Sequence, residues 1–401
     1  MTPQSEPYIM IAQQDWYDDL GSNARNLAME ISKTRKVLYV NPPLDINTMV
    51  RHGRKKQVKA RMKSAFGKKG LADNVAQNIW VHTPSSIFIS INWMGNENLF
   101  NILNRSNAFA FFNSIKKALK KLGWLASECT VFNDSQMFVG MYVNRFLQPS
   151  QNFYYIRDNL IQHPYFKKHG SHAEPKTIKQ ANAVFANSTY LADYARQYNF
   201  ESIDIGQGCE LDMYNPGLEQ PEPADLSGIP HPRIGYTGFL TGERLDIELL
   251  EQLAAKKNNW QWVLIGPEEV MFQQSKLHEM KNVHFMGSKK TDALPAYLLH
   301  MDVCINPQLI NELTVGNYPR KIDEYLAMGK PIVATHTPAM EMFLPHVHLA
   351  IGKDAYEDSI EAALNNHSRA KAAQAISFAK THTWKNCLSK IFKKQTELLH
   401  D

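Results

Sequence analysis

The chain has 401 residues, of which 44% are hydrophobic, and its formal net charge is +5. This length exceeds one compact core of usual size, so it predicts a globular protein of two domains with roughly 150 to 200 residues each. The sequence predicts neither a membrane-spanning nor a disulfide-stabilised protein, because its apolar runs fall far below the ~20 residues that cross a bilayer and its cysteines are widely separated.

The first half of the chain alternates short apolar stretches with helical patterns. Predicted strands lie at 8–12, 37–41, 79–82, 130–133, 153–157, 183–186 and 203–205, and predicted helices at 22–33, 97–122, 136–146, 174–180 and 189–198. From 215 to 232 the sequence becomes rich in proline, glycine and acidic residues, which indicates an interdomain linker.

The second half repeats the alternation more regularly, with predicted strands at 233–236, 260–265, 283–286, 303–306, 332–335 and 349–351. Their nearly continuous Val, Ile and Leu favour a parallel sheet covered by helices on both faces. We therefore predict an α/β chain of two Rossmann-like domains whose parallel sheets face each other across a ligand-binding cleft. The expected parts are residues 1–215, a linker at 216–232, residues 233–380, and a C-terminal helix at 381–401 that crosses back to the first domain.

The N-terminus lacks a basic segment followed by a long apolar stretch, so we expect a cytoplasmic protein. Positive charge is concentrated between Arg51 and Lys69, which contain nine Lys or Arg residues and no acidic residue. This cluster fits a solvated loop, an anionic membrane surface on the inner face of the cell membrane, or a diphosphate-linked acceptor. Apolar side chains that follow it could enter a membrane interface, namely Ile87, Phe88, Ile89, Trp93 and Phe100. Without a recognised nucleic-acid module, no nucleic acid partner is predicted.

Candidate acid–base residues follow the predicted strand 153–157. Asp158 stands at the end of this strand and His163 comes five residues later, both expected to face the cleft. Either side chain could act beside an acceptor hydroxyl. Asp158 could instead cap the next helix, and a lone histidine is often structural. Asp15 is another candidate, with a polar residue at a helix entry as its alternative.

The segment PRKIDEYLAMGKPIV, residues 319–333, combines a turn, a helix and a buried strand. Pro319 favours the start of a helix, and Lys321 and Glu324 lie on one face because they are three residues apart. A lysine there can neutralise phosphate, and a carboxylate can accept hydrogen bonds from a ribose diol. The pattern indicates a nucleoside diphosphate site, or else an ordinary salt bridge on an amphipathic helix.

The order of several motifs resembles a known enzyme family. RIGYTGFL, ERLDIELLEQLA, WQWVLIGP, NVHFMGSKKTDALPAYLLHMDVCINP and PRKIDEYLAMGKPIVAT follow one another as in the C-terminal domain of GT-B glycosyltransferases of the family-4 kind. Upstream, AVFANSTYLADYARQY and GQGCELDMYNP are similar to the passage that closes the first domain in that family. The resemblance covers approximately residues 153–333 and is weaker towards the N-terminus.

This resemblance implies donor-binding roles for residues at matching positions. Glu324 resembles the glutamate that holds the ribose, and Lys321 resembles a basic residue near the diphosphate. Gly238 corresponds to a glycine that lets backbone amides approach phosphate, and Arg244 would add charge. The segment 283–287, with Phe285 at its centre, resembles the loop lining the base pocket. In the first domain, the turn at Gly21 and Ser22 resembles the loop that faces the donor phosphates.

The sequence also departs from the family pattern. An acidic residue often stands eight positions before the ribose glutamate, but this position is Gly316 here. The usual Asn-Gly-Val-Asp appears as Gln207, Gly208, Cys209 and Glu210, and the Arg/Lys pair after the glycine turn is not reproduced. These departures leave sugar recognition open and make retention of stereochemistry only the favoured outcome.

The sequence contains no DxD triplet, no Walker-type phosphate loop and no GxGxxG fingerprint. We therefore predict a metal-independent, hexosyltransferase-like enzyme without a cofactor. It would move a sugar from a UDP-sugar or GDP-sugar donor to a carbohydrate or lipid-linked acceptor in surface-polysaccharide synthesis. The alternatives are a nucleotide-sugar epimerase of the same architecture and a non-catalytic protein that binds nucleotide sugars.

Overall fold

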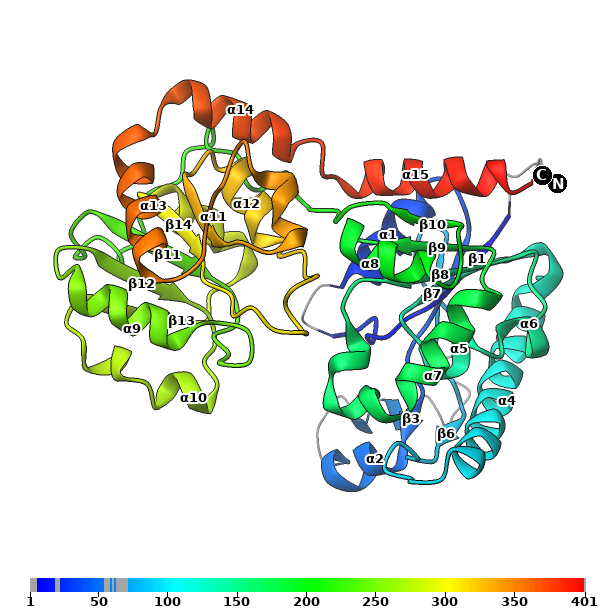
Figure 1. Ribbon diagram of the computed structural model, residues 1–401. Coiled ribbons are helices and arrows are strands. Elements are labelled where there is room, and N and C mark those ends of the chain that lie inside the picture. Colours follow the sequence, from blue (N-terminus) through cyan, green and yellow to red (C-terminus); the bar gives the residue numbers. More distant parts are fainter. Residues whose placement is uncertain (1–5, 19–21, 54–57, 60, 63–70, 400–401) are drawn as a thin grey trace. The chain divides into compact units, whose positions relative to one another are not determined.

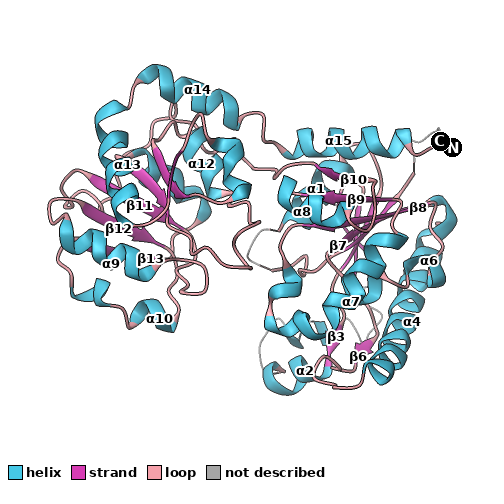
Figure 2. Ribbon diagram, in the orientation of Figure 1, coloured by secondary structure: helices cyan, strands magenta, loops and turns pink. Residues whose placement is uncertain are grey.

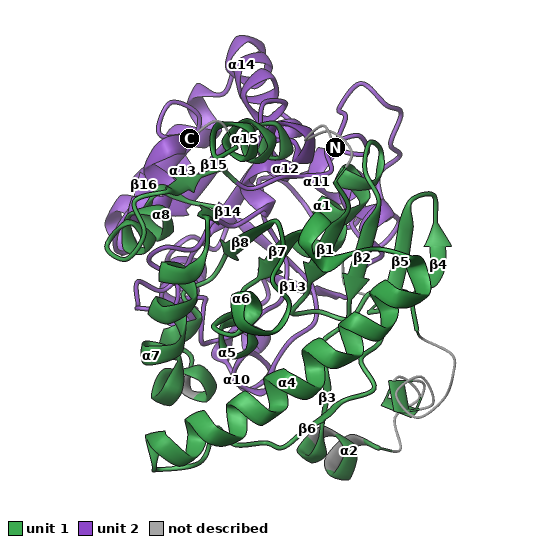
Figure 3. Cartoon of the chain, turned by 90° about the vertical axis from the view of Figure 1, so that its right-hand side faces the viewer, with its two compact units in different colours: residues 1–206, 387–401 green, residues 207–386 purple. Residues whose placement is uncertain are grey.

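The computed structural model divides the chain into two compact units (Figures 1 and 3). Unit 1 comprises Met1–Gly206 and Cys387–Asp401, and unit 2 comprises Gln207–Asn386. The structure describes residues 6–18, 22–53, 58–59, 61–62 and 71–399. Among these residues, no helix has the length and hydropathy needed to cross a membrane.

Unit 1 is built on an eight-stranded sheet in the order β10-β9-β8-β7-β1-β2-β5-β4. All neighbouring strands are parallel except β4 and β5, which are antiparallel. The central strands are buried along their whole length, because helices flank the sheet (Figure 2). The strands are β1 (Tyr8–Ile11), β2 (Val37–Val40), β4 (Asp73–Ala76), β5 (Ile79–His82), β7 (Thr130–Asp134), β8 (Gln151–Ile156), β9 (Ala183–Ala186) and β10 (Ser202–Asp204), and a separate pair is formed by β3 (Leu44–Asp45) and β6 (Ile87–Phe88).

The longest helix of unit 1, α4, begins at an Asn96 cap and ends at Gly123, whose φ of 70° gives a left-handed cap. Its inner face buries Phe111, Phe112 and Ile115 in the core of unit 1. The described helices are α1 (Asn23–Ser32), α2 (Ile46–His52), α4 (Glu97–Leu122), α5 (Met137–Gly140), α6 (Val143–Phe146), α7 (Pro164–Gln180), α8 (Thr189–Arg196) and α15 (Trp384–Glu397), with short η2 (Ala126–Glu128) and η3 (Leu160–Gln162).

Unit 2 contains a six-stranded, fully parallel sheet in the order β13-β12-β11-β14-β15-β16. Its strands are β11 (Arg233–Thr237), β12 (Gln261–Ile265), β13 (Val283–Gly287), β14 (Val303–Asn306), β15 (Ile332–Thr335) and β16 (His348–Ala350). Its described helices are α9 (Ile247–Lys256), α10 (Val270–Gln273), α11 (Leu294–Leu299), α12 (Lys321–Ala327), α13 (Lys353–Asn366) and α14 (Arg369–Ala379), with η4 (Lys276–Glu279), η5 (Thr291–Ala293) and η6 (Pro338–Phe343).

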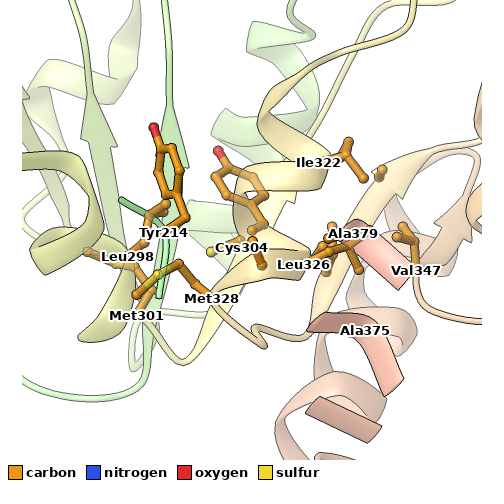
Figure 4. Close-up of a cluster of buried hydrophobic side chains, with 14 of the residues drawn as sticks. Tyr214, Leu298, Met301, Cys304, Ile322, Leu326, Met328, Val347, Ala375 and Ala379 are labelled. Carbon is orange, nitrogen blue, oxygen red and sulfur yellow. The ribbon is translucent and has the colours of Figure 1, made fainter. Parts of the chain in front are cut away.

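Two hydrophobic clusters lie in unit 2. One of them joins Ile322 and Leu326 of α12 to Ala375 and Ala379 of α14 (Figure 4). This packing fixes α12 at one face of the sheet, so the polar face of the helix is presented from a rigid base.

The structure differs from the predicted linker at 216–232. Leu226 and Ile229 of this segment are buried in the core of unit 2, and Ile229 accepts two hydrogen bonds from the Arg233 guanidinium. The division between units falls at Gly206 instead of residue 215. Proline and glycine correctly indicated a lack of regular structure, but an irregular segment can still pack closely on a domain.

The C-terminal helix predicted at 381–401 corresponds to α15, which residues 380–383 separate from α14. Within unit 1, α15 is held by Gln395, whose Oε1 accepts hydrogen bonds from Tyr8 Oη at 2.6 Å and Arg35 Nη1 at 2.7 Å. The Arg35 guanidinium also lies 3.9 Å from the ring centroid of Phe392. The last turns of the chain therefore pack beside its first strand.

Candidate functional site

The candidate donor site of unit 2 lies at the carboxyl end of β11. Gly238 follows this strand with a φ of +137°, and a Cβ placed on it would come within 2.9 Å of Lys321 Nζ. A Cβ on Gly266, at the end of the neighbouring β12, would come within 1.8 Å of the Gly238 carbonyl oxygen. Only glycine fits either position, so the backbone and the lysine ammonium group can approach one another closely.

Tyr325 fixes α12 to the end of β11. Its buried hydroxyl accepts a hydrogen bond from the Thr237 backbone amide at 2.8 Å and lies 3.1 Å from Thr237 Oγ1. Asp323, which is fully buried, holds the other side of the helix by accepting from Tyr318 Oη at 2.8 Å and lying 2.7 Å from His382 Nδ1. These contacts set the direction in which Lys321 and Glu324 leave the helix.

Lys321 reaches back over the end of β11. Its Nζ donates a hydrogen bond to Tyr236 Oη at 2.6 Å and lies 4.1 Å from the centroid of the same ring. Burial lowers the pKa of the Lys321 ammonium against the opposing effect of the Glu324 carboxylate, and with a smaller contribution from Arg244 the pKa comes to about 7. A lysine in this state binds a proton more strongly when an anion arrives.

Glu324 is partly exposed, one turn after Lys321. Burial raises the pKa of its carboxyl group, and the charges of Arg320 and Lys321 oppose this shift. Arg320 Nε is buried and, among the described residues, makes no hydrogen bond. The structure thus brings Gly238, Lys321 and Glu324 together and adds a neighbouring guanidinium with an unused donor.

Arg244 and Phe285 have different relations to this group. The positive charge of Arg244 acts on both groups: it opposes the burial that raises the pKa of Tyr236, and it adds to the burial that lowers the pKa of Lys321. Phe285 lies on β13 and stacks on His278, with ring centroids 3.9 Å apart. Within the described part of the chain, no hydrogen bond or ring contact joins Phe285 to Lys321, and its place in a base pocket stays a prediction.

In unit 1, Asp158 follows β8 and lies beside Arg157. The Asp158 Oδ2 is 3.8 Å from Arg157 Nη1, while Arg157 Nε donates to Asp134 Oδ1 at 2.9 Å. Asp134 is completely buried at the end of β7. The buried carboxylate of Asp134 therefore fixes the Arg157 guanidinium, which lies beside the Asp158 carboxylate.

The His163 side chain caps a helix. It is the N-cap of α7, where its Nδ1 accepts a hydrogen bond from the Tyr165 amide at 3.2 Å. The helix-capping role considered for Asp158 thus belongs to His163. The two side chains are not joined by any hydrogen bond or ion pair that the structure records among its described residues.

The remaining unit 1 candidates are Ser22, Gly21 and Asp15. Ser22 caps α1 by accepting from the Arg25 amide at 3.1 Å, while Gly21 lies outside the described residues. Asp15 accepts from the Tyr17 amide at 3.0 Å and lies 3.3 Å from Arg61 Nε, and burial raises the pKa of its carboxyl group. Most of the basic cluster 51–69 also lies outside the described residues, which include only 51–53, 58–59 and 61–62 of it.

Sequence reasoning missed Tyr236, Arg320 and the pair formed by Asp134 and Arg157. Arg320 precedes Lys321, and this Pro-Arg-Lys sequence could have indicated a second cation. Tyr236 lies inside one buried strand and Asp134 at the end of another, so no local pattern distinguishes them from core residues.

Comparisons with known proteins identify similar sequences and folds. Residues 231–366 match the family model described as glycosyl transferases group 1. A Bacillus subtilis (strain 168) protein, named for teichuronic acid biosynthesis as glycosyltransferase TuaH, is 26% identical over 253 residues, which are 60% of this chain and 62% of that relative. The matched region therefore spans less than two thirds of the length of this curated relative.

Solved structures resemble the chain over nearly its whole length. Sucrose-phosphate synthase from Thermosynechococcus elongatus is 14% identical with a TM-score of 0.68, covering 98% of this chain and 99% of that one. Anabaena Alr3699/HepE in complex with UDP and glucose is 14% identical with a TM-score of 0.62, covering 98% and 100%. The catalytic domain of Arabidopsis thaliana Starch Synthase IV, bound to ADP and acarbose, is 11% identical with a TM-score of 0.67, covering 99% and 100%. These similarities confirm the predicted GT-B fold.

Proposed function

We propose, for a chain whose residues 231–366 belong to the glycosyl transferases group 1 family, that it transfers a sugar from a nucleoside diphosphate sugar to a carbohydrate or lipid-linked acceptor. The observation that carries this proposal is the convergence of Gly238, Tyr236, Lys321 and Glu324 at the end of β11. The expected donor is a UDP-sugar or a GDP-sugar. The name of the TuaH relative supports a place in surface-polysaccharide synthesis, and the UDP bound to HepE supports a nucleotide donor.

Lys321 would neutralise the diphosphate. Gly238 leaves space for phosphate oxygens beside the ammonium group, and Arg244 and the unused Nε of Arg320 add positive charge. Cations fixed in a partly buried site stabilise the negative charge that develops on a leaving diphosphate. This arrangement supports metal-independent transfer without a cofactor.

Glu324 would accept hydrogen bonds from the ribose hydroxyls. The carboxylate is one helical turn from Lys321, so a ribose and its diphosphate can contact both side chains at once. Phe285 would lie at the base.

Asp158 is the candidate that would act on the acceptor hydroxyl in unit 1. Its carboxylate, which lies 3.8 Å from Arg157 Nη1, would accept a proton from the hydroxyl or orient it. His163 is the weaker candidate because its Nδ1 already caps α7. In the favoured retaining reaction, the leaving diphosphate itself takes the acceptor proton, and Asp158 then serves only to position the hydroxyl.

The donor site is tested by calorimetry with UDP and GDP as probes. Glu324→Ala removes two acceptors for ribose hydroxyls and should weaken nucleotide binding at least tenfold. Glu279→Ala, which removes an exposed carboxylate on η4, is the matched control and should leave affinity unchanged. Equal affinities of Glu324→Ala and the parent protein would contradict the assignment. Incubating a donor sugar without acceptor then separates a transferase from an epimerase.

A further inference from the structure

Unit 1 exposes five large side chains that form what we call the apolar patch: Ile46, Val50, Ile89, Trp93 and Tyr165. Val50 is 79% exposed and Trp93 is 74% exposed. Single exposed apolar residues are ordinary on protein surfaces, but a contiguous group indicates a contact surface. A contact surface therefore requires that the segments carrying these five residues lie side by side.

A chain of hydrogen bonds links the segments that carry the apolar patch. Ser90 Oγ donates to Asp45 Oδ1 at 3.1 Å, which joins the residue after Ile89 to the residue before Ile46. Trp93 Nε1 donates to the Ser90 carbonyl at 2.8 Å, and Asn92 Nδ2 donates to the Tyr165 carbonyl at 3.4 Å.

The helix and strands beside the patch form one side of unit 1. Val50 lies one turn after Ile46 on α2, so both side chains are on the same face of the helix. Figure 3 shows α2, β3 and β6 together at the lower edge of unit 1. The five residues thus lie on segments that are joined to one another on one side of unit 1.

Hydrogen bonds hold the backbone of the loop that carries the exposed Trp93 side chain. Its carbonyl accepts a hydrogen bond from Lys168 Nζ at 3.2 Å, and the next residue, Met94, has its carbonyl 3.0 Å from His169 Nε2. Phe100, which the sequence suggested for a membrane interface, is instead buried and stacks on His169 at 3.8 Å. The loop is therefore fixed to α7 while the indole remains outside.

Two lysines follow the patch residue Tyr165 on α7. Lys167 and Lys168 are both exposed there. Asp45, the residue before Ile46, is only partly exposed and accepts a hydrogen bond from Ser90.

The aromatic side chains of the patch and the lysines near it indicate which kind of partner the patch binds. Tryptophan and tyrosine favour the boundary between lipid headgroups and acyl chains, and lysines favour anionic headgroups. We propose that the apolar patch inserts into an anionic lipid surface. This inference deepens the proposed function and rests on it only in that a lipid-linked acceptor would be found at such a surface.

Co-sedimentation with lipid vesicles in the absence of nucleotide tests the inference. The full chain should bind vesicles containing phosphatidylglycerol at least tenfold more strongly than pure phosphatidylcholine vesicles, and its tryptophan emission should shift to shorter wavelength. Trp93→Ser and Val50→Ser together should weaken this binding at least tenfold. Phe200→Ser, at a side chain that is 84% exposed outside the patch, is the matched control and should bind as the parent does.

Three results would overturn the inference. The first is a parent protein that shows no preference for anionic vesicles. The second is a double variant that binds vesicles as strongly as the parent. The third is a dimer, seen by ultracentrifugation, that the double variant abolishes. The last result would assign the patch to a second copy of the chain. UDP binding by the parent protein separates the two proposals, since a parent that binds UDP but shows no preference for anionic vesicles contradicts only the membrane surface.

Discussion

Lys321 is the residue whose chemistry depends most directly on its surroundings. Its ammonium group lies over Tyr236 and beside Gly238, in a place where burial disfavours the charge. A bound diphosphate would reverse that preference, because an adjacent anion stabilises the protonated lysine. The residue is therefore suited to hold a proton when the nucleotide is present and to lose it when the site is empty.

A pH dependence of UDP binding follows. Because the pKa of Lys321 is about 7 without ligand and rises on binding, UDP should be bound with proton uptake above pH 7, and affinity should fall by up to tenfold per pH unit between pH 7 and 9. Lys321→Arg keeps the charge at every pH and should remove this slope. Calorimetry at pH 7, 8 and 9 measures the UDP affinity of the parent protein and of Lys321→Arg. Parallel slopes in the two proteins would show that another group titrates.

At the scale of elements, α7 carries a buried carboxyl group that has no cationic partner among the described residues. Glu174 accepts hydrogen bonds from Tyr154 Oη at 2.9 Å and Tyr194 Oη at 3.2 Å, and so joins α7 to β8 and α8. Burial raises the pKa of Glu174 to about 7, although both hydroxyl groups act in the opposite direction. The native protein therefore keeps a proton on Glu174 under conditions where the unfolded chain has lost it.

This difference makes the stability of unit 1 depend on pH. Between about pH 4.5 and 7 the native state binds more protons than the unfolded state, so the free energy of unfolding falls as pH rises, by on the order of 3 kcal/mol in total. Glu174→Gln should abolish this decline and unfold at a higher temperature than the parent at pH 8. Thermal unfolding at pH 5.5 and 8 measures the effect, with the exposed Glu97→Gln as control. A variant destabilised equally at both pH values would contradict it.

The elements of both sheets were largely predictable because parallel strands leave near-continuous apolar runs. The strand 79–82 was predicted with the bounds of β5, whereas the helix expected at 174–180 begins at Pro164 in the structure. Pro175 lies inside α7, and its local preference against a helix is outweighed by packing around Glu174. Tertiary contacts of this kind leave no local signal.

The candidate donor site was predictable only in part. The family resemblance indicated Gly238, Lys321 and Glu324, although the glycine and the lysine are more than eighty residues apart in the sequence. The contact between Lys321 and Tyr236 depends on how α12 docks on β11 through Tyr325. Likewise, the cap at His163 depends on where α7 begins, which the sequence placed ten residues too late.

At the scale of the whole molecule, unit 2 is a continuous segment inserted into unit 1. Gln207–Asn386 separate β10 from the last turns of the chain, and α15 completes unit 1 after unit 2 has been traversed. Gln395 is fully buried, and its amide also donates from Nε2 to Thr130 Oγ1 at 3.0 Å. Both termini therefore contribute to the core of unit 1, while the donor candidates Gly238, Lys321 and Glu324 all lie in unit 2.

This division predicts that unit 1 can be weakened without loss of donor binding. Gln395→Ala leaves Tyr8, Arg35 and Thr130 without their buried partner, at a cost of about 1–3 kcal/mol, and should lower the unfolding temperature of unit 1 by roughly 3–10 °C. UDP affinity should stay within twofold of the parent value. Calorimetric unfolding and titration measure the two quantities, with the exposed Lys393→Ala on the same helix as control. If UDP binding fell together with stability, the nucleotide would depend on unit 1 as well, and the donor site could not be assigned to unit 2 alone.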